Sequence, residues 1–150
     1  MPRLQEFSVD KDKAREGVWV PVGPNFYMKI SYAGNAEYIA DLEKRRRPYR
    51  TAILRGQMDD SKFIKEAAAA HLCRAWGEEA NGEVDFAGNV IDDAENLFER
   101  DGETVIPCNE ETCLRLFTDD NYPEFWREVD RSCVMLQLFR EDDIEDIVGN

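Results

Sequence analysis

The strongest constraint on the fold is a run of apolar residues at helical spacing over residues 60–76. The segment contains the tract Glu66–Ala70, which has the highest helix propensity in the chain, and Asp59 or Asp60 stands at its start as a candidate N-cap. The residues that recur at helical spacing on this face are Phe63, Ile64, Ala67, Ala68, His71, Leu72, Ala75 and Trp76. One face of this helix is therefore expected to be buried, so that helix packing forms much of the core.

A β-hairpin is predicted over residues 17–32. Two runs rich in Val, Trp, Phe, Tyr and Ile flank a Gly-Pro-Asn turn sequence. Every second residue from Phe26 to Tyr32 is apolar, and these side chains share one face because strand side chains alternate. Pro21 has no backbone N–H, which favours an edge position for the first strand.

Three further helices are predicted, at about residues 36–46, 110–118 and 122–140. Asn35 and Asn109 precede the first two, and asparagine is a preferred N-cap residue. The third begins at a Tyr-Pro pair, since proline is well accommodated in the first turn of a helix. Apolar residues follow the helical repeat in each segment, so each helix should contribute one face to the core.

The remaining segments complete a single compact domain over residues 1–140. Residues 77–96 have no clear periodicity and read as a long loop that contains a brief strand or a turn of helix. An Asp-Gly pair between two short apolar runs predicts a second short hairpin near residue 102. Residues 141–150 form an acidic tail. The expected fold is α+β and mainly α-helical, with these residues in its core: Trp19, Phe63, Leu72, Trp76, Leu116, Phe117, Trp126 and Val129.

The charge is large and unevenly distributed. The 150 residues carry a net charge of −13, with +4 over residues 1–58 and −17 over residues 59–150. Such a surface repels phosphate backbones, so direct binding to nucleic acid is not expected. The basic run at residues 44–50 is interpreted as a helix C-terminus that balances acidic surface elsewhere in the chain.

The sequence shows no targeting segment and no membrane span. No run approaches the roughly 18 apolar residues of a transmembrane helix, and the first residues lack the apolar region of a signal peptide. The protein is therefore expected in the cytoplasm, with reduced thiols.

Candidate catalytic and metal-binding residues are sparse. His71 is the single histidine, and Cys73 lies only two positions away, so the two side chains do not share a helix face. Cys73, Cys113 and Cys133 fall on apolar faces and read as small buried hydrophobes. The spacing of Cys108 and Cys113 is too wide for the usual zinc-binding pair, and phosphate-binding loops are absent. The sequence thus predicts no enzymatic activity, no metal site and no cofactor.

The order of the motifs resembles the tail assembly chaperones of long-tailed bacteriophages. The resemblance rests on the hairpin, the alanine-rich helix that ends in Trp76, the stretch Asp101–Phe117 with its Asp-Gly turn and Ile-Pro pair, and the Tyr122–Val129 helix start. It covers about residues 17–140. The family's link between the Trp and the acidic-Gly turn is shorter, so an insertion is implied over residues 77–98.

The resemblance implies a role without catalysis. Members of the family keep the tape measure protein in solution and help tail-tube subunits assemble around it. The implied partners are therefore the phage tape measure protein and the tail-tube protein, with the chain in the host cytoplasm and absent from the mature virion. Two alternatives remain: a structural virion component, such as a head–tail connector or tail-end protein, and an acidic inhibitor that mimics nucleic acid. The sequence leaves the oligomeric state open.

The candidate contact surface for a client is the end of the last helix together with the tail. Residues 144, 147 and 148 would align on one helical face, surrounded by acidic side chains. Alternating acids and aliphatics keep such a segment in solution while they offer an apolar stripe to a client helix. The predicted protein-binding residues are Leu138, Phe139, Ile144, Ile147 and Val148.

Overall fold

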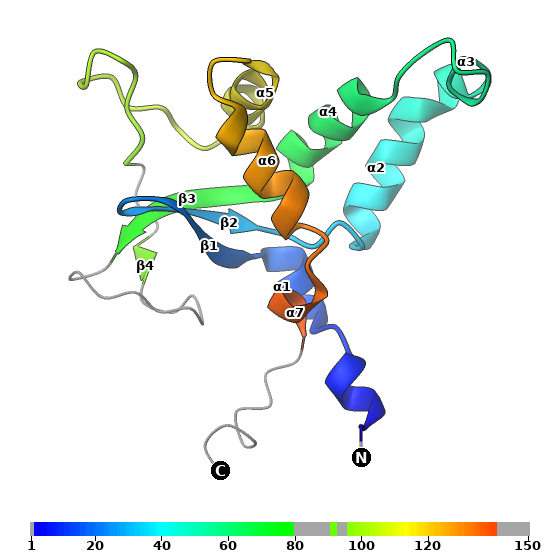
Figure 1. Cartoon of the computed structure of the whole chain (residues 1–150), viewed down its shortest axis with the longest axis horizontal. Helices are drawn as coiled ribbons and strands as arrows, with labels where there is room; N and C mark the ends of the chain where they lie inside the picture. Colours follow the sequence, from blue (N-terminus) through cyan, green and yellow to red (C-terminus); the bar gives the residue numbers. More distant parts are fainter. Residues whose placement is uncertain (1, 80–90, 93–95, 141–150) are drawn as a thin grey trace.

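The computed structural model describes residues 2–79, 91–92 and 96–140 (Figure 1). The fold is α+β and mainly helical, with an N-terminal hairpin followed by helices, which confirms the predicted fold class. The strands are β1 Val18–Gly23, β2 Phe26–Ile30, β3 Cys73–Glu79 and β4 Ile91–Asp92. The α-helices are α1 Lys11–Glu16, α2 Ala36–Arg46, α3 Arg50–Leu54, α4 Ser61–His71, α5 Glu110–Thr118, α6 Pro123–Ser132 and α7 Leu136–Phe139. Two short 3₁₀ helices are η1 Leu4–Phe7 and η2 Arg47–Tyr49.

The strands form one antiparallel sheet in the order β1-β2-β3-β4. The predicted hairpin is confirmed, with Val18 opposite Ile30 and a turn in which Asn25 adopts a positive φ of 52°. Met28 and Ile30 on β2 are completely buried. Helices α2, α4, α5 and α6 lie above the strands in Figure 1, and α1 and α7 lie together near the start of β1. The core therefore lies between one face of the sheet and the helices that pack on that face.

The helix predicted over residues 60–76 is shorter than expected, because α4 ends at His71 and residues 73–76 belong to strand β3. Short apolar runs fit a buried strand as well as a buried helix, so periodicity alone could not separate the two. The pairing with β2 decides the outcome: Met28 lies opposite Trp76 and Lys29 opposite Ala75. Without β3, the backbone groups along that edge of the buried strand β2 would lack hydrogen-bond partners.

The helices predicted at residues 36–46 and 110–118 are confirmed together with their caps. The Asn35 side chain accepts a hydrogen bond from the backbone N–H of Tyr38. Asn109 forms a reciprocal capping box with Thr112, in which each side chain binds the other's backbone N–H. Both helices therefore begin where the sequence places them.

The helix predicted over residues 122–140 is broken into α6 and α7 at residues 133–135. The carbonyl of Cys133 accepts a hydrogen bond of 2.8 Å from the N–H of Ala33. Met135 then adopts an extended conformation, which turns the chain and sends α7 back toward the N-terminal segment. A contact distant in sequence thus ends a helix that its apolar repeat would have continued.

The segment predicted as a loop over residues 77–96 contains the end of β3 and the short strand β4, which pairs with it. The predicted second hairpin is present as a small one. Phe98 and Val105 form a single bridge, and the N–H of Glu99 donates to the carbonyl of Thr104 at 2.8 Å. The Asp101 carboxylate accepts hydrogen bonds from the next residues in the turn, including the N–H of Glu103 at 2.8 Å.

Six of the eight residues predicted for the core are buried, and two are not. The buried ones are Phe63, Leu72, Trp76, Leu116, Phe117 and Val129. Trp19 is half-buried on the edge strand β1, where the Lys29 ammonium lies 5.9 Å from its ring centre. Trp126 packs against Phe117 at a ring separation of 5.5 Å but is also half-buried. Within the described part of the chain, no helix has the length and apolar character needed to cross a bilayer.

Candidate functional site

The structure changes the interpretation of the predicted contact residues. Phe139 is completely buried and packs against Tyr32, with ring centres 5.3 Å apart. Leu138 is half-buried against the core. Phe139 is therefore a core residue rather than a side chain offered to a partner, because the turn before α7 directs it inward. Ile144, Ile147 and Val148 lie outside the described residues.

The basic run at residues 44–50 is engaged in ion pairs within the chain. Arg46 lies 3.0 Å from Asp60, and Arg50 lies 2.6 Å from Glu43. Arg45 contacts three carboxylates, those of Asp41, Glu66 and Glu110. These contacts agree with the interpretation of the run as positive charge that balances acidic surface.

His71 belongs to the same network. Its Nε2 lies 2.8 Å from a carboxylate oxygen of Asp41, whose other oxygen accepts a hydrogen bond of 3.0 Å from Arg45 Nε. Burial would raise the pKa of Asp41, but the hydrogen bonds from Arg45 and His71 outweigh it and hold this pKa below its ordinary value of 3.8. The network joins α2 to α4, since Arg45 also binds Glu66.

Replacing Asp41 with asparagine should destabilise the fold by about 1.5–3 kcal/mol near neutral pH, the scale of hydrogen bonds to a charged group. A carboxyl whose pKa is lowered on folding adds stability above its unfolded pKa, and this stability is lost as the pH falls through the folded pKa. The difference between wild type and Asp41→Asn should therefore shrink below about pH 4. Urea denaturation across this pH range measures it.

The matched control is Asp12→Asn, because the Asp12 side chain is 81% exposed and its pair with Arg15 is long, at 3.7 Å. This change should alter stability by less than about 0.5 kcal/mol. A difference for Asp41→Asn that stays constant down to pH 3 would contradict the assigned role of the carboxylate.

A surface groove of about 600 Å³ lies between the small hairpin at residues 97–106 and helices α5 and α6. Its apolar lining comes from Leu97, Phe98, Ile106, Leu116, Tyr122 and Phe125. Phe98 is 48% exposed, although aromatic side chains of this size usually find cover within a domain. The groove thus presents uncovered apolar surface beside buried core residues.

Charged side chains surround the groove. The lining includes three acidic residues, Glu99, Asp101 and Asp119, and two basic residues, Arg100 and Arg115. It therefore carries a small excess of negative charge. Arg115 pairs with Glu99 at 2.8 Å, and Arg100 donates a hydrogen bond of 2.6 Å to the Tyr122 hydroxyl. Both arginines are thus engaged along the rim.

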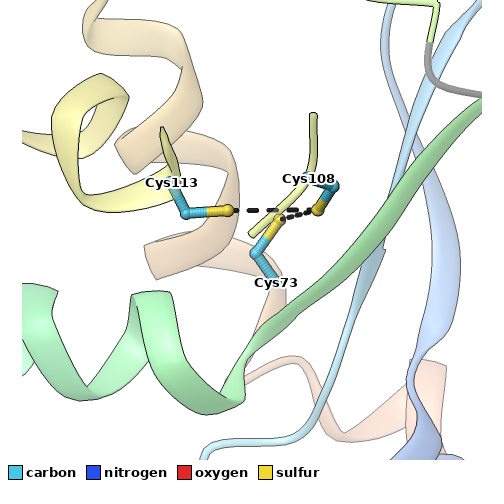
Figure 2. Close-up of side chains that lie close together, drawn as sticks. All are labelled: Cys73, Cys108 and Cys113. Atoms are coloured by element: carbon cyan, nitrogen blue, oxygen red, sulfur yellow. Dashed lines mark hydrogen bonds between the residues drawn. The ribbon is translucent and has the colours of Figure 1, made fainter. Parts of the chain in front are cut away.

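Three cysteines from separate segments of the chain come together. Cys73 lies at the start of β3, Cys108 in the linker after the hairpin, and Cys113 in the first turn of α5 (Figure 2). The sulfur of Cys108 lies 4.0 Å from that of Cys73 and 4.0 Å from that of Cys113. All three sulfurs lie within 4.8 Å of one another, and we call this group the cysteine cluster.

The thiols of the cysteine cluster shift one another's pKa values in opposite directions. Side-chain hydrogen bonds with Cys108 and Cys73 lower the pKa of the Cys113 thiol to about 5, against the opposing effect of burial. Side-chain hydrogen bonds with Cys108 and Cys113, together with burial, raise the pKa of Cys73 above its ordinary value. Cys133 lies elsewhere, and burial raises its pKa to about 11, as expected of an inert core thiol.

Sequence spacing could not reveal the cysteine cluster. Cys73 is 35 residues from Cys108, and the chain between them includes residues 77–96, whose sequence has no clear periodicity. The absence of closely spaced ligand pairs in the sequence predicts no metal site, whereas the fold brings three distant cysteines together. The sequence does place Cys108 directly before the N-cap residue Asn109 and Cys113 four residues after it.

Together, the fold and the groove define a small α+β protein with uncovered apolar surface inside a charged rim. Residues 33–150 match the YdaY prophage protein family, and this match spans most of the chain. The chain therefore belongs to the YdaY prophage protein family and is of phage origin. No curated protein matches it, and no solved structure matches it.

Proposed function

We propose that this prophage protein is a non-enzymatic tail assembly chaperone that binds the tape measure protein and helps the tail tube assemble around it. The observation that carries the proposal is the apolar groove between the small hairpin and α5–α6. Phage origin and the resemblance of the motif order to tail assembly chaperones supply the assembly context.

The groove suits an amphipathic client helix. Helix-in-groove recognition uses apolar side chains at helical spacing, which enter a hydrophobic groove while charged residues pair at its edge. Phe98 and Tyr122 offer aromatic surface of the kind that dominates binding energy in protein interfaces. The acidic excess of the rim would favour a client helix with Lys or Arg beside its apolar stripe.

The groove is less suited to a small ligand. Small-molecule sites place a few converging polar groups inside a mainly apolar cavity. Here the two arginines of the rim already bind Glu99 and the Tyr122 hydroxyl. The His71 imidazole is likewise engaged, because it contacts the Asp41 carboxylate, which also binds Arg45. These contacts support binding rather than catalysis as the work of the protein.

The proposal carries two statements on location. A chaperone for tail assembly acts in the host cytoplasm and is absent from the mature virion. Mass spectrometry of purified virions tests the second statement, and a stoichiometric presence there would favour the alternative of a head–tail connector or tail-end component.

The groove is tested by co-expression with the tape measure protein encoded by the same phage. Phe98→Asp places a charge on the apolar lining at a half-exposed position, so the fold should tolerate it. Leu54→Asp is the matched control, because Leu54 is 80% exposed and lies on α3, outside the groove lining. We expect wild type and Leu54→Asp to keep the client soluble, and Phe98→Asp to lose at least about tenfold in affinity, or 1.4 kcal/mol.

Deletion of residues 141–150 forms the second arm of the experiment, since Ile144, Ile147 and Val148 remain candidate contacts. If the client stays soluble with Phe98→Asp but not with the deletion, the binding surface is the tail rather than the groove. Equal client solubility with all variants and without the protein would contradict the chaperone proposal itself.

A further inference from the structure

We propose that Cys73, Cys108 and Cys113 bind a zinc(II) ion through three thiolates. The three sulfurs converge from β3, from the linker after the small hairpin and from α5, as Figure 2 shows. Cys73 and Cys113 are buried and Cys108 is half-buried, so the cluster is shielded on the core side and accessible at Cys108. A water molecule can complete a fourfold coordination from that accessible side.

The spacing of the sulfurs matches a metal tetrahedron. Zinc–sulfur bonds of about 2.3 Å place the sulfurs of a tetrahedral site about 3.8 Å apart. The Cys108 sulfur lies 4.0 Å from each of the other two, and no pair exceeds 4.8 Å. A bound ion therefore needs only small shifts of the side chains, without rearrangement of the backbone.

Sheet pairing and a helix cap fix the backbone around the three cysteines. In β3, one residue lies between Cys73 and Ala75, whereas their partners Ile30 and Lys29 are adjacent, which marks a bulge. A bulge redirects the neighbouring side chain, and Cys73 joins the same buried cluster as Trp76 despite their odd spacing along the strand.

The other two ligands are held by the cap of α5. The Asn109–Thr112 capping box lies between Cys108 and Cys113, and the Thr112 hydroxyl also donates to the carbonyl of Pro107. This short segment therefore presents both sulfurs to Cys73 in a fixed arrangement. Ligands that are ordered in advance reduce the entropy lost on binding.

Metal binding accounts for this grouping better than a disulfide does. A disulfide would join two of the three sulfurs at about 2.05 Å and leave the third thiol buried beside it. Binding of zinc(II) uses all three: each thiol releases its proton to solvent, and each thiolate donates an electron pair to the ion without any change in oxidation state. Soft thiolate ligands favour zinc(II) over the hard cations magnesium and calcium.

The ion would link β3 to α5 beside the groove. Cys113 precedes the groove residues Arg115 and Leu116 on α5, and Cys108 follows Ile106 of the hairpin. The proposed role is thus structural: the metal holds the hairpin segment against α5. This inference stands apart from the chaperone proposal, since the site can hold metal whether or not the groove binds a client.

The test uses the full chain, purified under reducing conditions and stripped of metal with a chelator. Cobalt(II) is added as a spectroscopic probe and then displaced by zinc(II), and the bound zinc is counted by elemental analysis. We expect one ion per chain, thiolate-to-cobalt charge-transfer bands and visible bands of tetrahedral intensity. Zinc should also protect three of the four thiols from alkylation, as read by mass spectrometry.

Cys108→Ser is the informative variant, because Cys108 is half-buried and its change should leave the fold intact. It should weaken zinc binding by at least about 100-fold, more than the loss of an outer partner costs. Cys133→Ser is the matched control and should bind zinc like the wild type, since Cys133 lies outside the cluster. Absence of cobalt–thiolate bands, equal affinity in Cys108→Ser, or a disulfide that persists with excess zinc would each overturn the proposal.

Discussion

Replacing Trp76 with alanine should lower the free energy of unfolding by about 3–5 kcal/mol, the range for large aromatic residues in a core. Trp76 is 1% exposed, lies opposite Met28 on the central strands and packs near Phe26, with ring centres 6.2 Å apart. Its indole N–H also donates to the carbonyl of Ile106 at 3.3 Å, which ties the small hairpin to the sheet. The change removes both the packing and this hydrogen bond.

The matched control is Trp19→Ala, since Trp19 is a half-buried tryptophan on the edge strand of the same sheet. It should cost only about 1 kcal/mol, because part of the ring is already in contact with water. Urea denaturation with a check that the m-value is unchanged gives both numbers. Equal losses for the two variants would show that the core is not centred on β3.

Replacing Phe139 with alanine should cost a similar 3–5 kcal/mol. The ring is completely buried against Tyr32, and the N–H of Asp10 donates to the Phe139 carbonyl at 2.7 Å. α7 therefore closes the fold against the N-terminal segment, and the variant should speed hydrogen exchange in α1. Denaturation and amide exchange measure the two effects.

Leu136→Ala on the same helix is the control, because Leu136 is 43% exposed and should contribute far less. If Phe139→Ala left stability within about 0.5 kcal/mol of wild type but abolished client binding, the first interpretation of Phe139 as a contact residue would stand.

Local signals in the sequence predicted the elements whose ends are set locally. Asn35 and Asn109 cap their helices through side-chain hydrogen bonds to residues three positions later, so the caps fix the helix starts. The hairpin at β1–β2 likewise forms around a turn that its own residues define. These features need no information from distant parts of the chain.

The predicted and observed elements differ where contacts between residues distant in sequence determine the local structure. Residues 73–76 have an apolar pattern that fits a helix, but β2 recruits them into the sheet. The helix after Pro123 ends at Ser132 because the Cys133 carbonyl binds Ala33, which lies a hundred residues earlier in the sequence. Trp19 and Trp126 are predicted to lie in the core, but an edge strand and a helix side leave each of them half-buried.

The candidate sites depend on the same distant contacts. The groove forms only when the small hairpin docks against α5 and α6, and the cysteine cluster only when β3 brings Cys73 to the cap of α5. A single sequence contains the residues of both sites but not their proximity. The acidic excess of the groove rim agrees with the negative charge of residues 59–150, which the sequence does show.

The most direct measurement of the central claim is site-specific photo-crosslinking from the groove. A photoreactive phenylalanine analogue placed at position 98, in cells that also make the tape measure protein of the same phage, should crosslink to a helical segment of that protein. The analogue at position 54, outside the groove lining, should not. Crosslinks from position 54 alone, or from neither position while the two proteins co-purify, would contradict the assignment of the groove as the client-binding surface.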